Sequence, residues 1–170
     1  TLTLLDAGSG YTIFLVALVL LGLGIGLAAP PATDLVMSGF PEPELGAAGG
    51  LNDTAVELGG SLGIAVLGSV LATTYQREIS AFLTGLPLAN LDGPTAAQAD
   101  MAAADARDSV GGAALVAEEL AKNPFASSYA RPLLDASADA FSEAITSASL
   151  VGGVALAVGA VVVTAVLPPR

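Results

Sequence analysis

Residues 51–74 read LNDTAVELGGSLGIAVLGSVLATT, a stretch of apolar and small residues that is long enough to cross a lipid bilayer. Two carboxylates, Asp53 and Glu57, interrupt this stretch. Residues four apart lie on the same face of an α-helix, so these two side chains share a face. A charged group at the centre of a membrane helix costs roughly 2.5–3.5 kcal/mol on insertion, and such groups usually face a protein interior or a water-filled path.

The composition of the whole chain indicates a membrane protein. Apolar residues make up 54% of the 170 residues and charged residues 12%, and the mean hydropathy is +0.74. Typical soluble domains carry about 25% charged residues. The apolar residues are concentrated in three blocks, at 11–29, 46–75 and 147–167, and most charges lie between the second and the third. We therefore predict an all-α membrane protein with three transmembrane helices.

The three blocks and the polar gaps between them predict the organisation of the chain. In chain order, the predicted segments are the end of a preceding loop at 1–10, a transmembrane helix at 11–39 with a kink at Pro30 and Pro31, a short loop at 40–45, a transmembrane helix with the acidic pair at 46–75, a long loop with short helices at 76–142, a transmembrane helix at 143–167 and a tail at 168–170.

The long loop carries helix signals of its own. We expect one helix at about 95–107 and a second that follows Ser109 as its N-cap, although Gly111 and Gly112 weaken the start of the second helix. A third helix is expected to begin near Pro132 and to run into the last span. The loop holds few large apolar residues, which argues against a core within it.

Four glycines, Gly22, Gly26, Gly59 and Gly63, form two pairs spaced by four residues inside the apolar blocks. Small residues at this interval let two membrane helices approach closely. We interpret these glycines as helix-packing positions. The alternative is that a chain rich in Gly and Ala contains such pairs by chance.

Several classes of function are excluded or disfavoured by composition. The chain contains no Cys and no His, which excludes disulfides, thiol chemistry and the usual zinc sites. Without His or Cys, a serine nucleophile lacks its usual base, so we expect neither an enzyme nor a cofactor. No metal site is expected. The excess of 16 acidic over 5 basic residues argues against a nucleic acid as partner.

The run GLGIGLAAPPATDLVMSGFPEPELGAAGGLNDTAVELGGSLGIAVLGSVLATTY, at 22–75, resembles the major facilitator superfamily drug:proton antiporters with fourteen spans. The later ARDSVGGAALVAEEL, at 106–120, resembles the long external loop of that family. The resemblance implies the last three spans of such a transporter, with the short loop and the tail in the cytoplasm. Arg170 at the C-terminus favours the same orientation. The resemblance to these antiporters also implies proton-driven export of small, cationic or amphipathic compounds across the plasma or inner membrane.

The same resemblance gives the acidic residues a role. In such transporters, acidic residues of the penultimate span have been linked to cation recognition or proton coupling, and Asp53 and Glu57 occupy that position. Asp34, in PPATDLVM, is a third candidate near the predicted cytoplasmic end. The residues alone leave another interpretation open, in which Asp53 reaches water or caps a neighbouring helix.

Three hypotheses for function remain. Because the chain begins with Thr1 rather than Met, we expect a piece of a longer exporter, whose partners are the lipid bilayer, the remaining spans and a small substrate. The second hypothesis is a stand-alone three-span protein that scaffolds other membrane proteins through its glycine faces. The third is a membrane-anchored module whose long loop binds an external partner.

Overall fold

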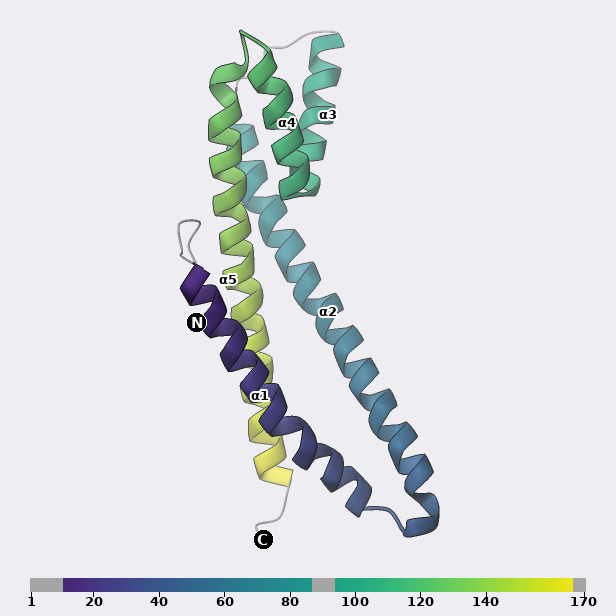
Figure 1. The fold of residues 1–170 in the computed structure, drawn as a ribbon. Coiled ribbons are helices and arrows are strands. Elements are labelled where there is room, and N and C mark those ends of the chain that lie inside the picture. Colours follow the sequence, from purple (N-terminus) through teal and green to yellow (C-terminus); the bar gives the residue numbers. More distant parts are fainter. Residues whose placement is uncertain (1–10, 87–93, 167–170) are drawn as a thin grey trace.

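The computed structural model describes residues 11–86 and 94–166, and these residues are almost entirely helical, as Figure 1 shows. The elements are α1 (Tyr11–Ser38), the 3-10 turn η2 (Glu42–Glu44), α2 (Leu45–Thr84), α3 (Pro94–Asp108), α4 (Val110–Lys122) and α5 (Ser127–Val166). No strand occurs in these two ranges. The predicted segments at 1–10 and 168–170 lie outside the described residues.

Three of the helices, α1, α2 and α5, are long and apolar enough to cross a membrane. This confirms the prediction of an all-α protein with three candidate spans. Helix α1 stays continuous through Pro30 and Pro31. Proline within a helix leaves a carbonyl of the preceding turn without its N–H partner, and membrane helices tolerate this where neighbours or local adjustments satisfy the carbonyl. The kink itself remains a prediction.

Helices α2 and α5 extend well beyond the length of a membrane span. Helix α1 has 28 residues and α2 has 40, so at 1.5 Å per residue they measure about 42 and 60 Å. Helix α1 ends and α2 begins at the turn around η2. Because α2 is the longer helix, its last part projects past the first residues of α1 (Figure 1). The predicted span at 46–75 therefore continues as helix for nine more residues, to Thr84.

Helix α5 begins earlier than the sequence indicated. It starts at Ser127 rather than near Pro132, so the predicted start is wrong by five residues. Proline favours the first turn of a helix because the N–H groups there have no intrahelical partner. In α5 the proline instead occupies the second turn, where it removes a single hydrogen bond to the carbonyl of Ser128.

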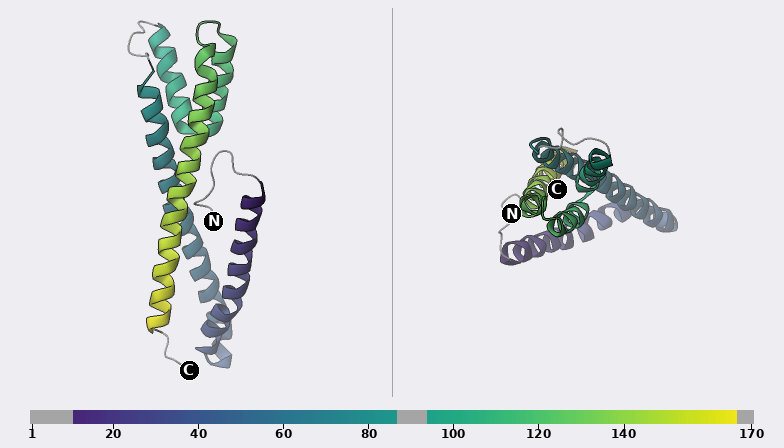
Figure 2. Two further views of the ribbon diagram at one scale, coloured as in Figure 1. Left: turned by 90° about the vertical axis from the view of Figure 1, so that its left-hand side faces the viewer. Right: turned by 90° about the horizontal axis from the view of Figure 1, so that it is seen from above.

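Beyond the length of α1, four helical segments pack together into what we call the head: residues 73–84 of α2, helices α3 and α4, and residues 127–148 of α5 (Figures 1 and 2). The core of the head consists of Tyr75, Ile79, Leu83, Ala103, Ala106, Ala113, Ala117, Ala130, Leu133, Ala140 and Ala144. Seven of these eleven residues are alanine. The expectation that this region has no core is therefore wrong, because alanine faces let helices approach closely and α2 contributes three of the larger side chains.

Two hydrogen bonds connect α2 to α3 within the head. The Tyr75 hydroxyl donates to the carbonyl oxygen of Ala106 at 2.9 Å, and Arg107 Nε donates to Ser80 Oγ at 3.2 Å. Ala106 lies in the last four residues of α3, where carbonyls have no N–H partner within the helix. The tyrosine therefore satisfies a carbonyl that the end of α3 leaves open.

The turn between α3 and α4 places their backbones very close together. Ser109 is the N-cap of α4, as predicted, and its Oγ accepts a hydrogen bond from the N–H of Gly112 at 3.0 Å. A Cβ added to Gly112 would overlap the carbonyl oxygen of Asp105 and lie 2.9 Å from the carbonyl carbon. Gly112, which weakens α4 by helix propensity alone, is thus the residue that permits this close approach.

The surface of the head is charged. Lys122 Nζ lies 3.1 Å from Glu118 and 3.2 Å from Glu119, and these hydrogen bonds raise the pKa of the exposed ammonium group. Asp135, Asp139 and Glu143 are all exposed and follow one another at intervals of four along α5. They form a solvated acidic stripe on this helix.

Below the head, the three long helices have few neighbours. Helices α2 and α5 diverge towards the ends that lie away from the head (Figures 1 and 2). The two helices are still close at Leu67, because a Cβ added to Gly152 of α5 would lie 3.5 Å from Leu67 Cδ2. Beyond this point, the residues at 53–62 and 153–166 are exposed. Helix α1 contacts α2 near their shared turn, where Ala48 is fully buried.

Candidate functional site

The acidic pair lies in the first third of α2. Asp53 and Glu57 are about 12 and 18 Å along the helix from its first residue, Leu45. Both side chains are exposed in the described structure. Asn52 Nδ2 donates to Asp53 Oδ1 at 3.4 Å, which is a long contact. The spacing of four places the two carboxylates on one face of the helix, one turn apart.

Asp34 lies on α1, four residues before its end at Ser38, and is exposed as well. Because the short turn around η2 joins α1 to α2, Asp34 and Asp53 belong to the same end of the molecule. Within the described ranges, no hydrogen bond or ion pair links Asp34 or Glu57 to another side chain. The structure therefore places the three candidates at one end without bringing them into contact.

The apolar parts of the long helices carry no basic side chain that could balance the charges of Asp34, Asp53 and Glu57. Residues 1–76 contain no Lys and no Arg, and neither do residues 132–169. An unpaired carboxylate at membrane depth is costly unless it is protonated, binds a cation or reaches water. As a group that accepts protons and hydrogen bonds, it can carry a proton or hold a cationic group.

The four predicted packing glycines are not in contact with another helix of the described structure. A Cβ built on Gly22, Gly26, Gly59 or Gly63 meets no atom of the described residues within 4 Å. A packing role for these glycines thus requires neighbours other than these helices and stays a prediction. Two other glycines of the described helices do approach a second long helix: Gly152 lies against Leu67 of α2, and Gly49 lies against Met37 of α1.

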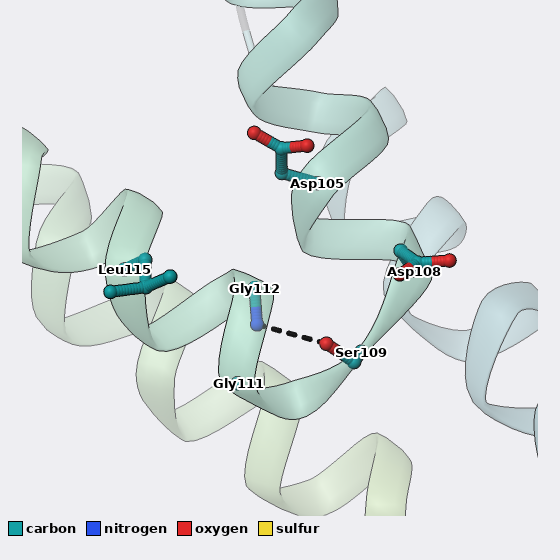
Figure 3. A pocket seen from close by; sticks show the side chains of 6 residues that line it. All are labelled: Asp105, Asp108, Ser109, Gly111, Gly112 and Leu115. Atoms are coloured by element: carbon teal, nitrogen blue, oxygen red, sulfur yellow. Dashed lines mark hydrogen bonds between the residues drawn. The ribbon is translucent and has the colours of Figure 1, made fainter.

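A shallow hollow of about 430 Å³ lies beside the turn between α3 and α4, lined by Asp105, Asp108, Ser109, Gly111, Gly112 and Leu115 (Figure 3). Figure 3 also shows the hydrogen bond between Gly112 and Ser109 that caps α4. Here and elsewhere in the described residues, no group of three or more His, Cys, Asp or Glu side chains is placed to hold a metal ion. The hollow is a feature of the close helix approach.

Sequence reasoning missed the residues that build the head. The apolar run predicts that a span ends at Tyr75, whereas the helix continues past this residue and the tyrosine hydroxyl bonds a neighbouring helix. Helix propensity predicts only that Gly112 weakens the start of α4. Neither role is visible without the neighbouring backbone, since the partners are Ala106, 31 residues away in sequence, and Asp105.

Comparison with known proteins gives several drug export proteins as relatives. The chain is 45% identical over 69 residues to the tetracenomycin C resistance and export protein of Streptomyces glaucescens, over 41% of this chain and 13% of that protein. It is 31% identical over 145 residues to the multidrug efflux pump LfrA of Mycolicibacterium smegmatis, over 85% of this chain and 25% of that protein. A third relative is the quinolone resistance protein NorB of Staphylococcus aureus, 41% identical over 51 residues, over 30% of this chain and 11% of NorB.

No family model matches the chain, and no solved structure matches it. The chain spans at most about a quarter of the length of the three relatives named above. The long apolar helices and the efflux relatives together define a multi-pass membrane protein. More particularly, the chain is homologous to drug efflux proteins of the major facilitator superfamily, which confirms the resemblance found in its sequence.

Proposed function

We propose that the chain is the C-terminal part of a proton-coupled antiporter that exports small molecules across the cell membrane. The export and efflux functions in the names of its relatives support this assignment, as does the match over 85% of this chain to about a quarter of LfrA. In this proposal α1, α2 and α5 are the last three spans of a major facilitator half, and the proton gradient drives transport without any cofactor. The chain acts as a transporter and not as an enzyme.

The proposed orientation has the turn at 39–44 and the end of α5 in the cytoplasm. The head then lies outside the cell. The structure supports a common side for the turn and the end of α5, because both lie at the same end of the molecule (Figure 1). The substrate of the proposed transporter is a small, cationic or amphipathic compound.

The observation that carries the proposal is the acidic pair without a compensating base. Asp53 and Glu57 lie within an apolar helix, and residues 1–76 offer no Lys or Arg. Glu57 lies one turn deeper than Asp53, so it is harder for water to reach from the cytoplasmic end. A carboxylate in such a place alternates between binding a proton and binding a cation, which is the exchange that an antiporter needs. We therefore assign coupling to Glu57, with a smaller contribution from Asp53.

Transport by the longer protein in everted membrane vesicles tests this assignment. Glu57→Gln keeps the shape of the side chain and removes its charge, and we expect it to slow proton-driven export of cationic compounds by about 10-fold or more, with less effect on neutral ones. Asp53→Asn should have a smaller effect. Asp139→Asn, which removes an exposed carboxylate of the head, is the matched control and should export at the wild-type rate. Unchanged export of both compound types by Glu57→Gln, at equal expression, would refute the coupling role.

A three-span scaffold without transport activity is the second candidate. The glycines at 22, 26, 59 and 63 favour it, because open space around the Cβ position of each suits close packing against helices of another protein. Expression of the 170-residue chain by itself separates the two candidates. A scaffold inserts stably and co-purifies with one membrane protein in fixed ratio, whereas a transporter part is degraded or aggregates unless the preceding spans are supplied.

A further inference from the structure

We propose that Asp34, Asp53 and Glu57 lie in the cytoplasmic third of the bilayer, so that these carboxylates take up protons and cations from the cytoplasm. Their role and the orientation of the chain come from the proposed function, on which this inference rests; their depth and the side from which they are reached are new. Two contacts that align the three long helices carry the inference, together with the places where the charges stop along α2 and α5.

Helices α2 and α5 are antiparallel, and one close approach sets their alignment below the head (Figure 1). A Cβ added to Gly152 would lie 3.5 Å from Leu67 Cδ2, so Gly152 and Leu67 lie at the same level. The head has the same alignment. Tyr75, eight residues along α2 from Leu67, belongs to the core of the head. Ala144, eight residues along α5 from Gly152, belongs to it as well.

The charges of both helices stop at one level on the side of the head. On α2 the last charge before the apolar part is Arg77, ten residues from Leu67. On α5 it is Glu143, nine residues from Gly152. Because the helices are aligned at Leu67 and Gly152, these two charges differ in level by only about 2 Å. This level therefore marks the outer edge of the bilayer.

The length of the charge-free part of α5 then gives the position of the bilayer centre. After Glu143, no charge occurs over the 23 residues up to Val166, where the described helix ends. These residues measure about 34 Å, and the hydrocarbon core of a bilayer is about 30 Å thick. The bilayer fills almost the whole stretch, so its centre lies near Ala155. By the alignment of the two helices, Ala155 is level with Ile64 of α2.

This centre places both carboxylates of α2 on the side of the turn around η2. Glu57 lies seven residues, or about 10 Å, from Ile64, which is about 5 Å inside the edge of the hydrocarbon core. Asp53 lies eleven residues, or about 16 Å, from Ile64, which is at the edge itself. A helix tilt of about 20° shortens these distances by only about 6%.

A second close approach aligns Asp34 of α1 with Asp53. A Cβ added to Gly49 of α2 would lie 3.6 Å from Met37 Cε of α1, so Gly49 and Met37 share a level. Away from the turn around η2, Asp34 lies three residues from Met37, and Asp53 lies four residues from Gly49. The two carboxylates therefore differ in level by only about 2 Å. All three carboxylates are closer to the cytoplasmic edge than to the centre of the bilayer.

Depth measurements with single spin labels, on the full chain in lipid nanodiscs, test this placement. Collisions of a label with oxygen, which enters lipid, and with a water-soluble nickel complex report its depth. The chain has no native cysteine. The labels are attached at Leu58→Cys, Ile64→Cys and Val161→Cys, which change exposed apolar residues and leave the carboxylates in place.

Leu58 is adjacent to Glu57 and, by the alignment of α2 and α5, level with Val161. We expect the labels at 58 and 161 to lie at equal depth, and the label at 64 to lie about 9 Å deeper than either. A label at 58 that is as deep as the label at 64, or depths at 58 and 161 that differ by more than one helical turn of about 5 Å, would overturn the placement.

The side of access is tested in the longer transporter. Asp53→Cys should react with an impermeant cationic methanethiosulfonate in everted vesicles, whose cytoplasmic face is outside, and should be protected in intact cells. Phe125→Cys, an exposed position of the head, is the control and should show the opposite pattern. Equal reaction of Asp53→Cys from both sides would overturn uptake from the cytoplasm.

Transport by Glu57→Gln separates this inference from the proposed function. Unchanged export by Glu57→Gln, together with the expected depths, would refute the coupling role while supporting the position of the carboxylates. Slowed export together with equal depths at 58 and 64 would support the coupling role and overturn the position.

Discussion

Replacing Gly112 by alanine should destabilise the head, whereas the same change at Gly111 should not. The Cβ of an alanine at position 112 overlaps the carbonyl oxygen of Asp105, which belongs to the backbone of α3. A backbone atom cannot rotate away as the end of a flexible side chain can, so α3 and α4 must move apart. At position 111 the new Cβ lies 3.7 Å from Ser109 Oγ, which is an ordinary contact.

The two variants share every other effect, so their difference isolates the overlap. Gly to Ala within a helix stabilises by roughly 0.5–1 kcal/mol, and this gain applies to both positions because each lies in the first turn of α4. Overpacking of a close contact costs about 1–3 kcal/mol. We therefore expect Gly112→Ala to be about 1–3 kcal/mol less stable than Gly111→Ala.

Hydrogen exchange of the backbone amides of α3 and α4, in the full chain in nanodiscs, measures this difference. A loss of 1–3 kcal/mol corresponds to exchange that is about 5- to 150-fold faster where opening of the head limits exchange. The amides of α1 give an internal reference, because α1 lies outside the head. If the amides of α3 and α4 exchange at the same rate in both variants, the backbones of the two helices are not held as close as the structure has them.

Three further predictions concern other parts of the chain. Tyr75→Phe removes the hydroxyl that satisfies the carbonyl of Ala106 and should destabilise α3 by about 1–3 kcal/mol. The backbone amides at 103–108 should then exchange their hydrogens faster. Amide exchange equal to that of the control Tyr129→Phe, which changes an exposed tyrosine, would contradict this prediction. Gly63→Leu in this chain alone should leave the helix content and the thermal midpoint in detergent unchanged, because no described atom lies within 4 Å of its Cβ; the same change in a longer transporter should reduce the folded yield if another span packs there. Single cysteines at Ser38 and Phe125, both exposed, should differ in their reaction with an impermeant maleimide added to intact cells, with Phe125→Cys reacting and Ser38→Cys protected; equal labelling would exclude opposite sides.

The helices could be predicted from the sequence because their signals are local. Three apolar runs of span length predict three long helices, and Ser109 predicts the start of α4 because an N-cap bonds only to the turn that follows it. The start of α5 was predicted wrongly because a proline marks a first turn only on average. Local rules thus give the type of an element more reliably than its ends.

The head could not be predicted in the same way, because it depends on how helices far apart in sequence are rotated relative to one another. Tyr75 and Ala106 meet only when α2 extends past the membrane segment and α3 folds back against it. An alanine-rich loop also gives no strong apolar pattern, although its helices pack well. For the candidate site, the sequence places Asp53 and Glu57 on one helix face, and in the described structure both side chains are exposed.

The length of α2 and α5 gives small changes in the head a mechanical consequence. Each helix is a lever of about 60 Å. A rotation of about 5° at the head end would displace the far end by about 5 Å, which is close to one helical turn. In the proposed orientation, a ligand or an antibody that tilts the exposed head by such an angle would therefore displace the cytoplasmic ends of these helices from outside the cell.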